Sequence, residues 1–143
     1  MQIADILGVK GSDVVTISPD AAVRDAVAAL ARHRIGALVV SSVPGRAEGV
    51  VSERDIVRRL DHARDGLLDL RVREIMSAPV LTCRPDDGVE AVMHTMTEQR
   101  VRHLPVERDG ELVGLVSIGD VVKATIEKLE LDRRLLEDYI RAR

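Results

Sequence analysis

The chain has 143 residues and a formal net charge of −3; 45% of its residues are hydrophobic, and Tyr139 is the sole aromatic residue. This length fits one domain with a sizeable core, because domains usually span ~100–200 residues. The missing aromatics exclude proteins that stack the bases of single-stranded nucleic acid or that cage quaternary ammonium groups. Without a basic excess to neutralise phosphates, nucleic acid is not an expected partner.

Neither a membrane segment nor a catalytic centre is evident in the sequence. No apolar run approaches the ~20 residues that span a bilayer, and the N-terminal residues lack the charged and apolar regions of a secretion signal. The four histidines lack metal-ligand spacing, and Cys83 has no assigned base, which favours a small buried side chain. We therefore expect a cytoplasmic protein that is not an enzyme, has no catalytic residues, binds no metal and contacts no membrane.

Internal duplication is the most informative feature of the sequence. Residues 14–40 overlay residues 80–106, and after the loss of one residue in a loop, residues 49–57 overlay residues 114–122. The identities include Thr16 with Thr82, Asp20 with Asp86, Arg34 with Arg100, and Gly49 with Gly114. Two copies of a unit of ~60 residues therefore account for almost the whole chain, which is typical of repeat proteins.

The first copy predicts the element order β-α-β-β-α. Residues 14–17 are rich in β-branched side chains and predict a strand. Ser18 and Pro19 are typical of the cap and the first position of a helix. This helix has an apolar face made of Val23, Ala26, Val27 and Leu30. Strands are predicted at residues 38–40 and 49–51, and a second helix from residue 52 to about residue 60.

The second copy repeats the same order. Residues 80–83 predict a strand, and the helix after it has an apolar face made of Val89, Val92, Met93 and Met96. Strands at residues 104–106 and 112–116 are joined by Asp109-Gly110, a strong signal for a hairpin turn. A helix follows from residue 117. The predicted fold class is therefore α/β (α+β), built from two β-α-β-β-α repeats.

We divide the chain into a first repeat at residues 1–62, a linker at 63–71, a second repeat at 72–128 and a C-terminal helix extension at 129–143. Three leucines of the linker region, Leu67, Leu68 and Leu70, predict that it packs against the protein. The final helix carries a heptad-like seam interrupted by Arg133, with Tyr139 beside it. The apolar residues of the seam are Val122, Ile126, Leu129, Leu136 and Ile140. Two interpretations stay open: this helix lies along its own domain, or it is an arm that contacts a partner subunit.

The duplicated motifs resemble a pair of cystathionine-β-synthase (CBS) domains, also called a Bateman module, over roughly residues 1–128. The segments that carry the resemblance are 72–76 (VREIM), 80–82 (VLT), 102–106 (RHLPV), 49–55 (GVVSERD) and 114–120 (GLVSIGD). Their order, spacing and duplication make the resemblance specific, although each segment alone is a weak signal. The resemblance implies that the repeats pack about a pseudo-two-fold axis and leave two clefts between them.

The resemblance also implies a function. The clefts of such modules bind adenosine compounds, among them AMP, ADP, ATP, NAD and S-adenosylmethionine, as regulatory ligands rather than required cofactors. The chain is thus similar to a stand-alone regulatory, energy-sensing module that forms a homodimer and acts on an unidentified regulated protein. The alternative is a structural or interaction module whose clefts stay empty and which acts through homodimerisation.

Two constellations, Ser52-x-x-Asp55 and Ser117-x-x-Asp120, are the central candidate sites. Each is predicted where a strand ends and a helix begins, so free N–H groups and a partial positive charge there suit a phosphate. The resemblance implies that each aspartate accepts the two ribose hydroxyls and each serine lies near phosphate. The same spacing also forms a capping box, which needs no ligand. Both interpretations stay open, and both can hold together.

The resemblance extends the candidate site to further residues. It implies that a threonine, Thr16 or Thr82, lies beside the ligand, although each is equally ordinary as a solvent-facing residue of a strand. It also implies that backbone groups near residues 35–37 or 101–103 hold the adenine and that aliphatic side chains such as Val51 or Val116 form the walls. Arg54, Arg102 and His103 have no equivalents in the other copy, which predicts unequal sites with phosphate better bound where these three converge. For Arg102 and His103, a surface ion pair is the alternative. The predicted ligand-binding residues are Thr16, Ile35, Ala37, Ser52, Arg54, Asp55, Thr82, Val101, Arg102, His103, Ser117 and Asp120.

Overall fold

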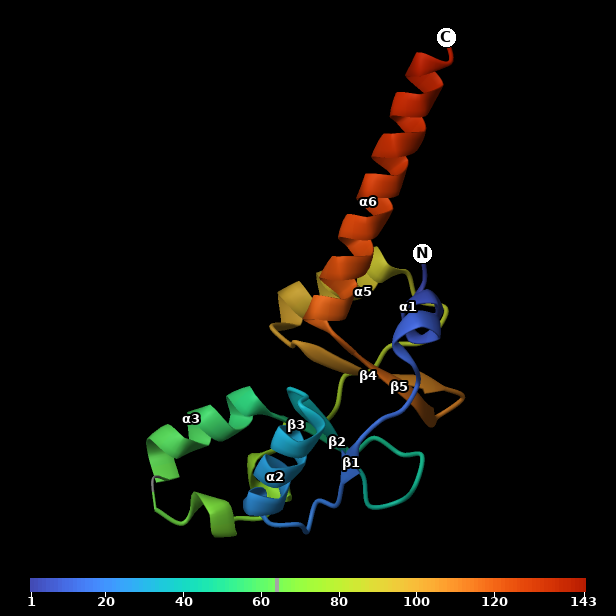
Figure 1. Ribbon diagram of the computed structural model, residues 1–143. Helices are drawn as coiled ribbons and strands as arrows, with labels where there is room; N and C mark the ends of the chain where they lie inside the picture. Colours follow the sequence, from blue (N-terminus) through green and yellow to red (C-terminus); the bar gives the residue numbers. More distant parts are fainter. Residues whose placement is uncertain (64) are drawn as a thin grey trace.

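The computed structural model describes residues 1–63 and 65–143, which form helices around two small sheets (Figure 1). The helices are α1 (Ile3–Lys10), α2 (Val23–His33), α3 (Glu53–Ala63), α4 (Val72–Ile75), α5 (Val89–Gln99) and α6 (Ile118–Arg141), with a 3-10 turn, η1 (Leu67–Asp69). The strands are β1 (Thr16–Ile17), β2 (Ala37–Val40), β3 (Gly49–Ser52), β4 (His103–Arg108) and β5 (Glu111–Ser117).

Each repeat contributes one sheet. The first has the order β1-β2-β3, with β1 parallel and β3 antiparallel to β2. The second is the antiparallel pair β4-β5. Asp109 and Gly110 join β4 to β5 with φ angles of 52° and 80°, as a two-residue hairpin turn with two left-handed residues requires. The hairpin prediction is therefore confirmed.

Two sequence predictions about the repeat starts are wrong. The helix α2 begins at Val23 with Ala22 at its N-cap, not at Pro19. The Asp20 N–H donates to Ser18 Oγ at 3.2 Å, so this serine closes a local turn instead of capping the helix, which short hydroxyl side chains do readily. In the second copy, the strand predicted at residues 80–83 shrinks to one parallel bridge between Cys83 and Val106.

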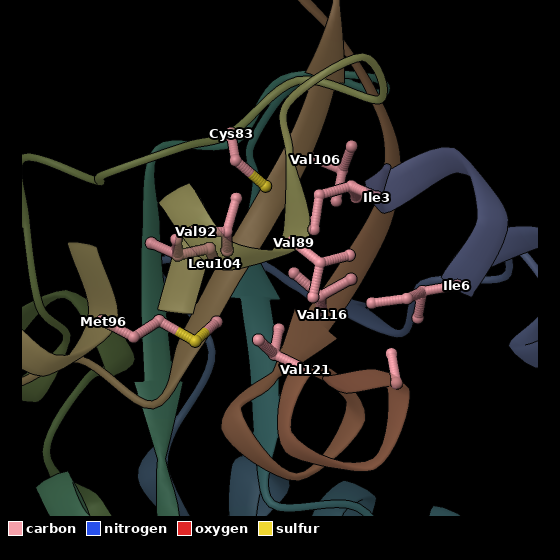
Figure 2. Packing of buried hydrophobic residues seen from close by; sticks show 11 residues of the cluster. Ile3, Ile6, Cys83, Val89, Val92, Met96, Leu104, Val106, Val116 and Val121 are labelled. Atoms are coloured by element: carbon pink, nitrogen blue, oxygen red, sulfur yellow. The ribbon is translucent and has the colours of Figure 1, made fainter. Parts of the chain in front are cut away.

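Two aliphatic clusters form the core, one for each sheet. The cluster around β4 and β5 is shown in Figure 2 and contains Ile3, Ile6, Cys83, Val89, Val92, Met96, Leu104, Val106, Val116, Val121 and Ala124. The cluster around β2 and β3 contains Val23, Ala26, Ala29, Leu30, Leu38, Val40, Val51, Leu67, Val72 and Ile75. The buried Leu67 confirms that the linker packs against the protein, although Leu68 is exposed. Val27 of the predicted apolar face is also exposed.

The first helix of each repeat packs into the core of the other repeat. Ile3 and Ile6 of α1 lie in the cluster of the second sheet, whereas Val72 and Ile75 of α4 lie in that of the first. Backbone bonds hold these segments in place, since Ile3 N–H donates to the Asp87 carbonyl at 3.0 Å and Val72 N–H to the Ala21 carbonyl at 2.8 Å. The two repeats are therefore interlocked rather than joined by one linker alone.

The duplicated glycines Gly49 and Gly114 admit these exchanged segments. A Cβ atom on Gly114 would lie 2.7 Å from Leu7 Cδ2, and a Cβ atom on Gly49 would lie 2.9 Å from Met76 Sδ. At Gly49 the Cβ atom would also lie 2.9 Å from the Ser77 carbonyl oxygen, a backbone atom. Glycine at this strand position therefore permits the close approach of the segment after α4, whereas the atoms near Gly114 belong to the flexible Leu7 side chain.

The helix α6 runs far beyond the second repeat, and Figure 1 shows it leaving the body with the C-terminus at its far end. Only Val121 and Ala124 of this helix are buried, and every residue from 126 to 143 is exposed. The interpretation that this helix lies along its own domain is therefore wrong. In the part of the chain that the structure describes, no helix is both long and apolar enough to cross a membrane.

Candidate functional site

A hollow of about 150 Å³ lies between the two repeats. This is smaller than the ~300–1,000 Å³ of pockets that enclose a ligand, so a bound molecule would stay partly open to solvent. Residues of the first repeat form one side of it and residues 100–103 form the other. Its lining consists of Gly36, Val50, Ser52, Glu53, Arg54, Asp55, Arg58, Ser77, Arg100, Val101, Arg102 and His103.

Ser52 and Asp55 lie at the junction of β3 and α3, at the edge of this hollow. The Ser52 N–H and hydroxyl donate to Asp55 Oδ2 at 2.8 and 3.0 Å, and the Asp55 N–H contacts Ser52 Oγ at 3.3 Å. The capping box is thus present. The Ser77 hydroxyl donates to Asp55 Oδ1 at 3.2 Å. Apart from backbone N–H, the donors on this carboxylate are neutral hydroxyls, which can exchange with the hydroxyls of a ligand.

Four arginines line the same hollow. Arg54 and Arg58 come from α3, and Arg100 and Arg102 from the segment between α5 and β4. None of the ion pairs among residues 1–63 and 65–143 involves these four guanidinium groups. The alternative of a surface ion pair for Arg102 is therefore not realised. Arginines without carboxylate partners are available to bind phosphate oxygens with their planar forks.

His103 lies at the start of β4 and packs against the first repeat. A Cβ atom on Gly36 would lie only 3.3 Å from His103 Nε2, so the absence of a side chain at Gly36 lets the imidazole approach. Burial lowers the pKa of His103 below its ordinary value of 6.5, and the Lys10 charge lowers it further. The imidazole is therefore neutral near pH 7, and the expected positive charge appears only at a pH below 6.5.

This titration predicts a pH dependence of stability. An unfolded histidine titrates near pH ~6.5, whereas His103 in the folded protein holds its proton less tightly. Unfolding therefore takes up a proton, and the free energy of unfolding falls as the pH drops below 6.5. Urea unfolding at pH 7.5 and 5.5 should show a smaller loss of stability in His103→Gln than in the parent protein. Equal losses in both proteins would show that His103 does not carry this effect.

The second constellation, Ser117 and Asp120, has the same capping box, but a lysine side chain contacts its carboxylate. The Ser117 N–H donates to Asp120 Oδ2 at 2.8 Å, and the Asp120 N–H to Ser117 Oγ at 3.1 Å. Lys10 of α1 places its ammonium 2.6 Å from Asp120 Oδ2 and 2.8 Å from the Leu115 carbonyl. Burial alone would raise the pKa of Asp120, but the bonds from Lys10 and Ser117 outweigh it and hold this pKa below its ordinary value.

Several predicted site residues lie outside the hollow. Thr16 and Thr82 are exposed, Ile35 packs against the first core and Ala37 is buried, and none of them is among the described lining residues. Their role in ligand binding stays a prediction. The prediction that Val51 and Val116 form the walls of the adenine site is wrong, because both side chains are fully buried in the two cores.

Sequence reasoning also missed lining residues. Val50 lines the hollow in place of Val51, since successive strand residues face opposite sides of a sheet. Arg58 follows Asp55 by one helical turn, so helical spacing could have identified it. Ser77 carries no sequence signal, because it reaches Asp55 only through the packing of α4 on the first repeat. Lys10 likewise reaches Asp120 only through the folding of α1 onto the second repeat.

Cys83 is a buried residue of the second core. The Cys83 side chain is 5% exposed, and burial followed by the nearby Asp87 charge raises the pKa of this thiol to about 12. Within the described ranges 1–63 and 65–143, no group of three or more His, Cys, Asp or Glu side chains could hold a metal ion. A thiol of such high pKa is a packing residue rather than a nucleophile at neutral pH.

Comparisons with known proteins agree on one family. A family model described as the CBS domain matches residues 4–62 and 72–127. The mitochondrial CBS domain-containing protein CBSX3 of Arabidopsis thaliana is 33% identical over 147 residues, which cover 96% of this chain and 71% of that protein.

Solved structures confirm the predicted fold class. The CBS-domain containing protein ATU1752 from Agrobacterium tumefaciens has a TM-score of 0.84 at 39% identity, covering 87% of this chain and 99% of that one. The CBS domain pair of protein MJ0100, solved in complex with 5′-methylthioadenosine and S-adenosyl-L-methionine, has a TM-score of 0.78 at 24% identity. That match covers 90% of this chain and 98% of that one, and at this identity it shows the fold alone.

Proposed function

The chain belongs to the CBS-domain family, and from this premise we propose that it is a non-catalytic regulatory module that binds an adenosine nucleotide in the hollow beside Asp55. The observation that carries the proposal is that the hollow brings a carboxylate at a helix start together with four arginines that form none of the ion pairs among the described residues. Asp55 would accept the ribose hydroxyls, and the arginines would bind the phosphates. Aliphatic Val50 and Val101 would contact the base, since the chain has no aromatic side chain in this region.

The charge of the hollow selects among the adenosine compounds. Arg54, Arg58, Arg100 and Arg102 exceed the two acids of the lining, Glu53 and Asp55. AMP, ADP, ATP and NAD carry phosphates that suit this charge, whereas the sulfonium of S-adenosylmethionine is repelled by it. The complex of the MJ0100 pair supports adenosine as the common group. We therefore propose a phosphate-bearing nucleotide as the ligand of this chain.

A thermal-shift panel with AMP, ADP, ATP, NAD and S-adenosylmethionine tests this function. A ligand present at 100 times its dissociation constant stabilises a folded protein by about 2.7 kcal/mol. At least one phosphate-bearing nucleotide should raise the melting temperature, and S-adenosylmethionine should raise it least. If no nucleotide at millimolar concentration shifts the transition, the module acts with empty clefts and the proposal is wrong.

The second site should be closed to ligand by Lys10. Its ammonium holds Asp120 Oδ2 through a charge-assisted bond and is anchored on the Leu115 carbonyl, so a ribose would have to displace a stronger donor than a hydroxyl. Calorimetry with AMP should give one site per chain, and Lys10→Ala should give a second. The control Lys123→Ala, one turn after Asp120, should keep one. Two sites in the parent protein, or one in Lys10→Ala, would contradict the closure.

A ligand in this hollow would regulate by bridging the two repeats. Its contacts with α3 and with residues 100–103 would differ between two packings of the repeats, and without such a difference in affinity no signal could pass. We propose energy sensing through the ratio of adenosine nucleotides, a homodimeric state and a cytoplasmic location as the finer parts of this function. Fractionation of cells tests the location, since one relative is named as mitochondrial.

A further inference from the structure

His103 contributes a titratable imidazole to the lining of the hollow beside Asp55. It is the first residue of β4 and lies level with Ser117 across the β4–β5 pair, next to the second constellation. A Cβ atom on Gly36 would lie 3.3 Å from its Nε2, so the ring also reaches the first repeat. A half-buried ring in this place responds to the charge of a molecule bound in the hollow, because solvent screens that charge only in part.

Charged groups from four segments face this imidazole. Burial is the largest of the effects that lower its pKa, and the charges of Lys10 on α1 and of the neighbouring Arg102 lower it further. The carboxylates of Asp120 on α6 and Glu53 on α3 act in the opposite direction and raise it. The net result is a pKa below 6.5 in the free protein. The other charged side chains that line the hollow are Arg54, Asp55, Arg58 and Arg100.

A bound phosphate changes this balance of charges. Arginine stays protonated throughout the pH range in which proteins fold, whereas a histidine can gain or lose its charge near neutral pH. Arg100 and Arg102 belong to the same segment as His103, so a phosphate that these arginines bind lies near the imidazole. An opposite charge within ~4–6 Å favours the charged form of a titratable group. A phosphate in the hollow therefore favours the protonated form of His103.

We propose that His103 makes nucleotide binding depend on pH: the hollow takes up a proton together with a phosphate-bearing nucleotide and binds it more tightly as the pH falls. This proton uptake rests on the proposed nucleotide binding, since it is the bound phosphate that favours the imidazolium. The pKa of His103 is then higher with nucleotide than without it. Affinity is therefore lowest above the pKa of the complex, rises as the pH falls and reaches its maximum below the pKa of the free protein.

Calorimetric titration with AMP at pH 7.5 and 5.5 tests this linkage in the parent protein and in His103→Gln. The phosphate of AMP itself gains a proton near pH ~6, but this change is common to both proteins and cancels in the ratio of their affinities. The ratio of parent to variant affinity should grow by at least about threefold between pH 7.5 and 5.5, because one linked proton changes affinity by up to about tenfold per pH unit.

The control His94→Gln removes an exposed imidazole from α5 and should follow the parent protein at both pH values. If AMP binds and the ratio for His103→Gln is the same at both pH values, the role of His103 is refuted while nucleotide binding stands. If AMP binds the parent protein at neither pH, the proposed function fails as well.

The imidazole signals in NMR spectra give a second measurement of the same linkage. His33, His62 and His94 are exposed and serve as internal references. The signal of His103, assigned by its absence in His103→Gln, should have its titration midpoint at least about half a pH unit higher with saturating AMP than without it. The three reference signals should keep their midpoints. A midpoint for His103 that stays in place or falls with AMP would overturn the proposal.

Discussion

Replacing Asp55 with alanine should weaken AMP binding at least ~100-fold while leaving the fold intact. Hydrogen bonds to a charged group contribute about 1.5–3 kcal/mol each, and in the proposed complex this carboxylate accepts two ribose hydroxyls. The variant also loses the bond from the Ser52 N–H to the Asp55 carboxylate, but Ser52 Oγ still accepts from the N–H of residue 55, so the cost in stability should stay within about 1 kcal/mol. Isothermal titration calorimetry of the folded variant at pH 7.5 measures the change in affinity.

Asp120→Ala is the matched control for this variant. It removes the corresponding carboxylate and the same half of the capping box in the second repeat, together with the ion pair to Lys10, so its loss of stability should be at least as large. Because Lys10 already holds Asp120, AMP affinity at the first site should change by no more than about twofold. Equal loss of binding in both variants, or a loss confined to Asp120→Ala, would contradict the assignment of the hollow beside Asp55.

Replacing Ile3 with alanine should lower the free energy of unfolding by about 2–5 kcal/mol, the range for deleting a large buried aliphatic side chain. The Ile3 side chain is fully buried, although it is the third residue of the chain. It packs with β4, β5 and α5, so the damage should fall on the second repeat rather than the first. Urea unfolding measures the free energy, and hydrogen exchange locates the loss.

Val9→Ala is the control on the same helix, since Val9 is 90% exposed. It should change the free energy of unfolding by less than about 0.5 kcal/mol. In Ile3→Ala, the amides of β4 and β5 should exchange faster relative to those of β2 and β3. Faster exchange in the first repeat, or a cost as small as that of Val9→Ala, would show that the two repeats do not exchange their leading segments.

The sequence predicted the parts of the fold that depend on local patterns. Asp109-Gly110 predicted the hairpin between β4 and β5, because few residue pairs adopt two successive left-handed conformations. The helical spacing of the apolar residues between 89 and 96 predicted α5. Ser18 misled the prediction because the same hydroxyl can cap a helix or close a turn, and only packing decides between them. The direction of α6 beyond Ala124 was likewise open, since an apolar seam does not say which surface it contacts.

The candidate site was predictable only on the side that the duplicated motif encodes. Ser52 and Asp55 were predicted because the same residues recur in the second copy. Arg102 and His103 were predicted because the first copy has no equivalent residues. Lys10 and Ser77 belong to the first segments of the two repeats, and they reach Asp120 and Asp55 through contacts between residues distant in sequence. Unequal sites were expected from the arginines and stay a prediction, and in the structure Lys10 on Asp120 is a further difference between the two constellations.

The most direct test of nucleotide binding beside Asp55 is an NMR titration of the ¹⁵N-labelled protein with AMP. Amide signals of Gly36, Asp55, Ser77 and residues 101–103 should shift together and saturate at one ligand per chain, whereas those of Leu115 and Asp120 should stay in place. Shifts centred on Asp120 and Lys10, or no shifts with millimolar AMP, ADP, ATP or NAD, would contradict nucleotide binding in this hollow.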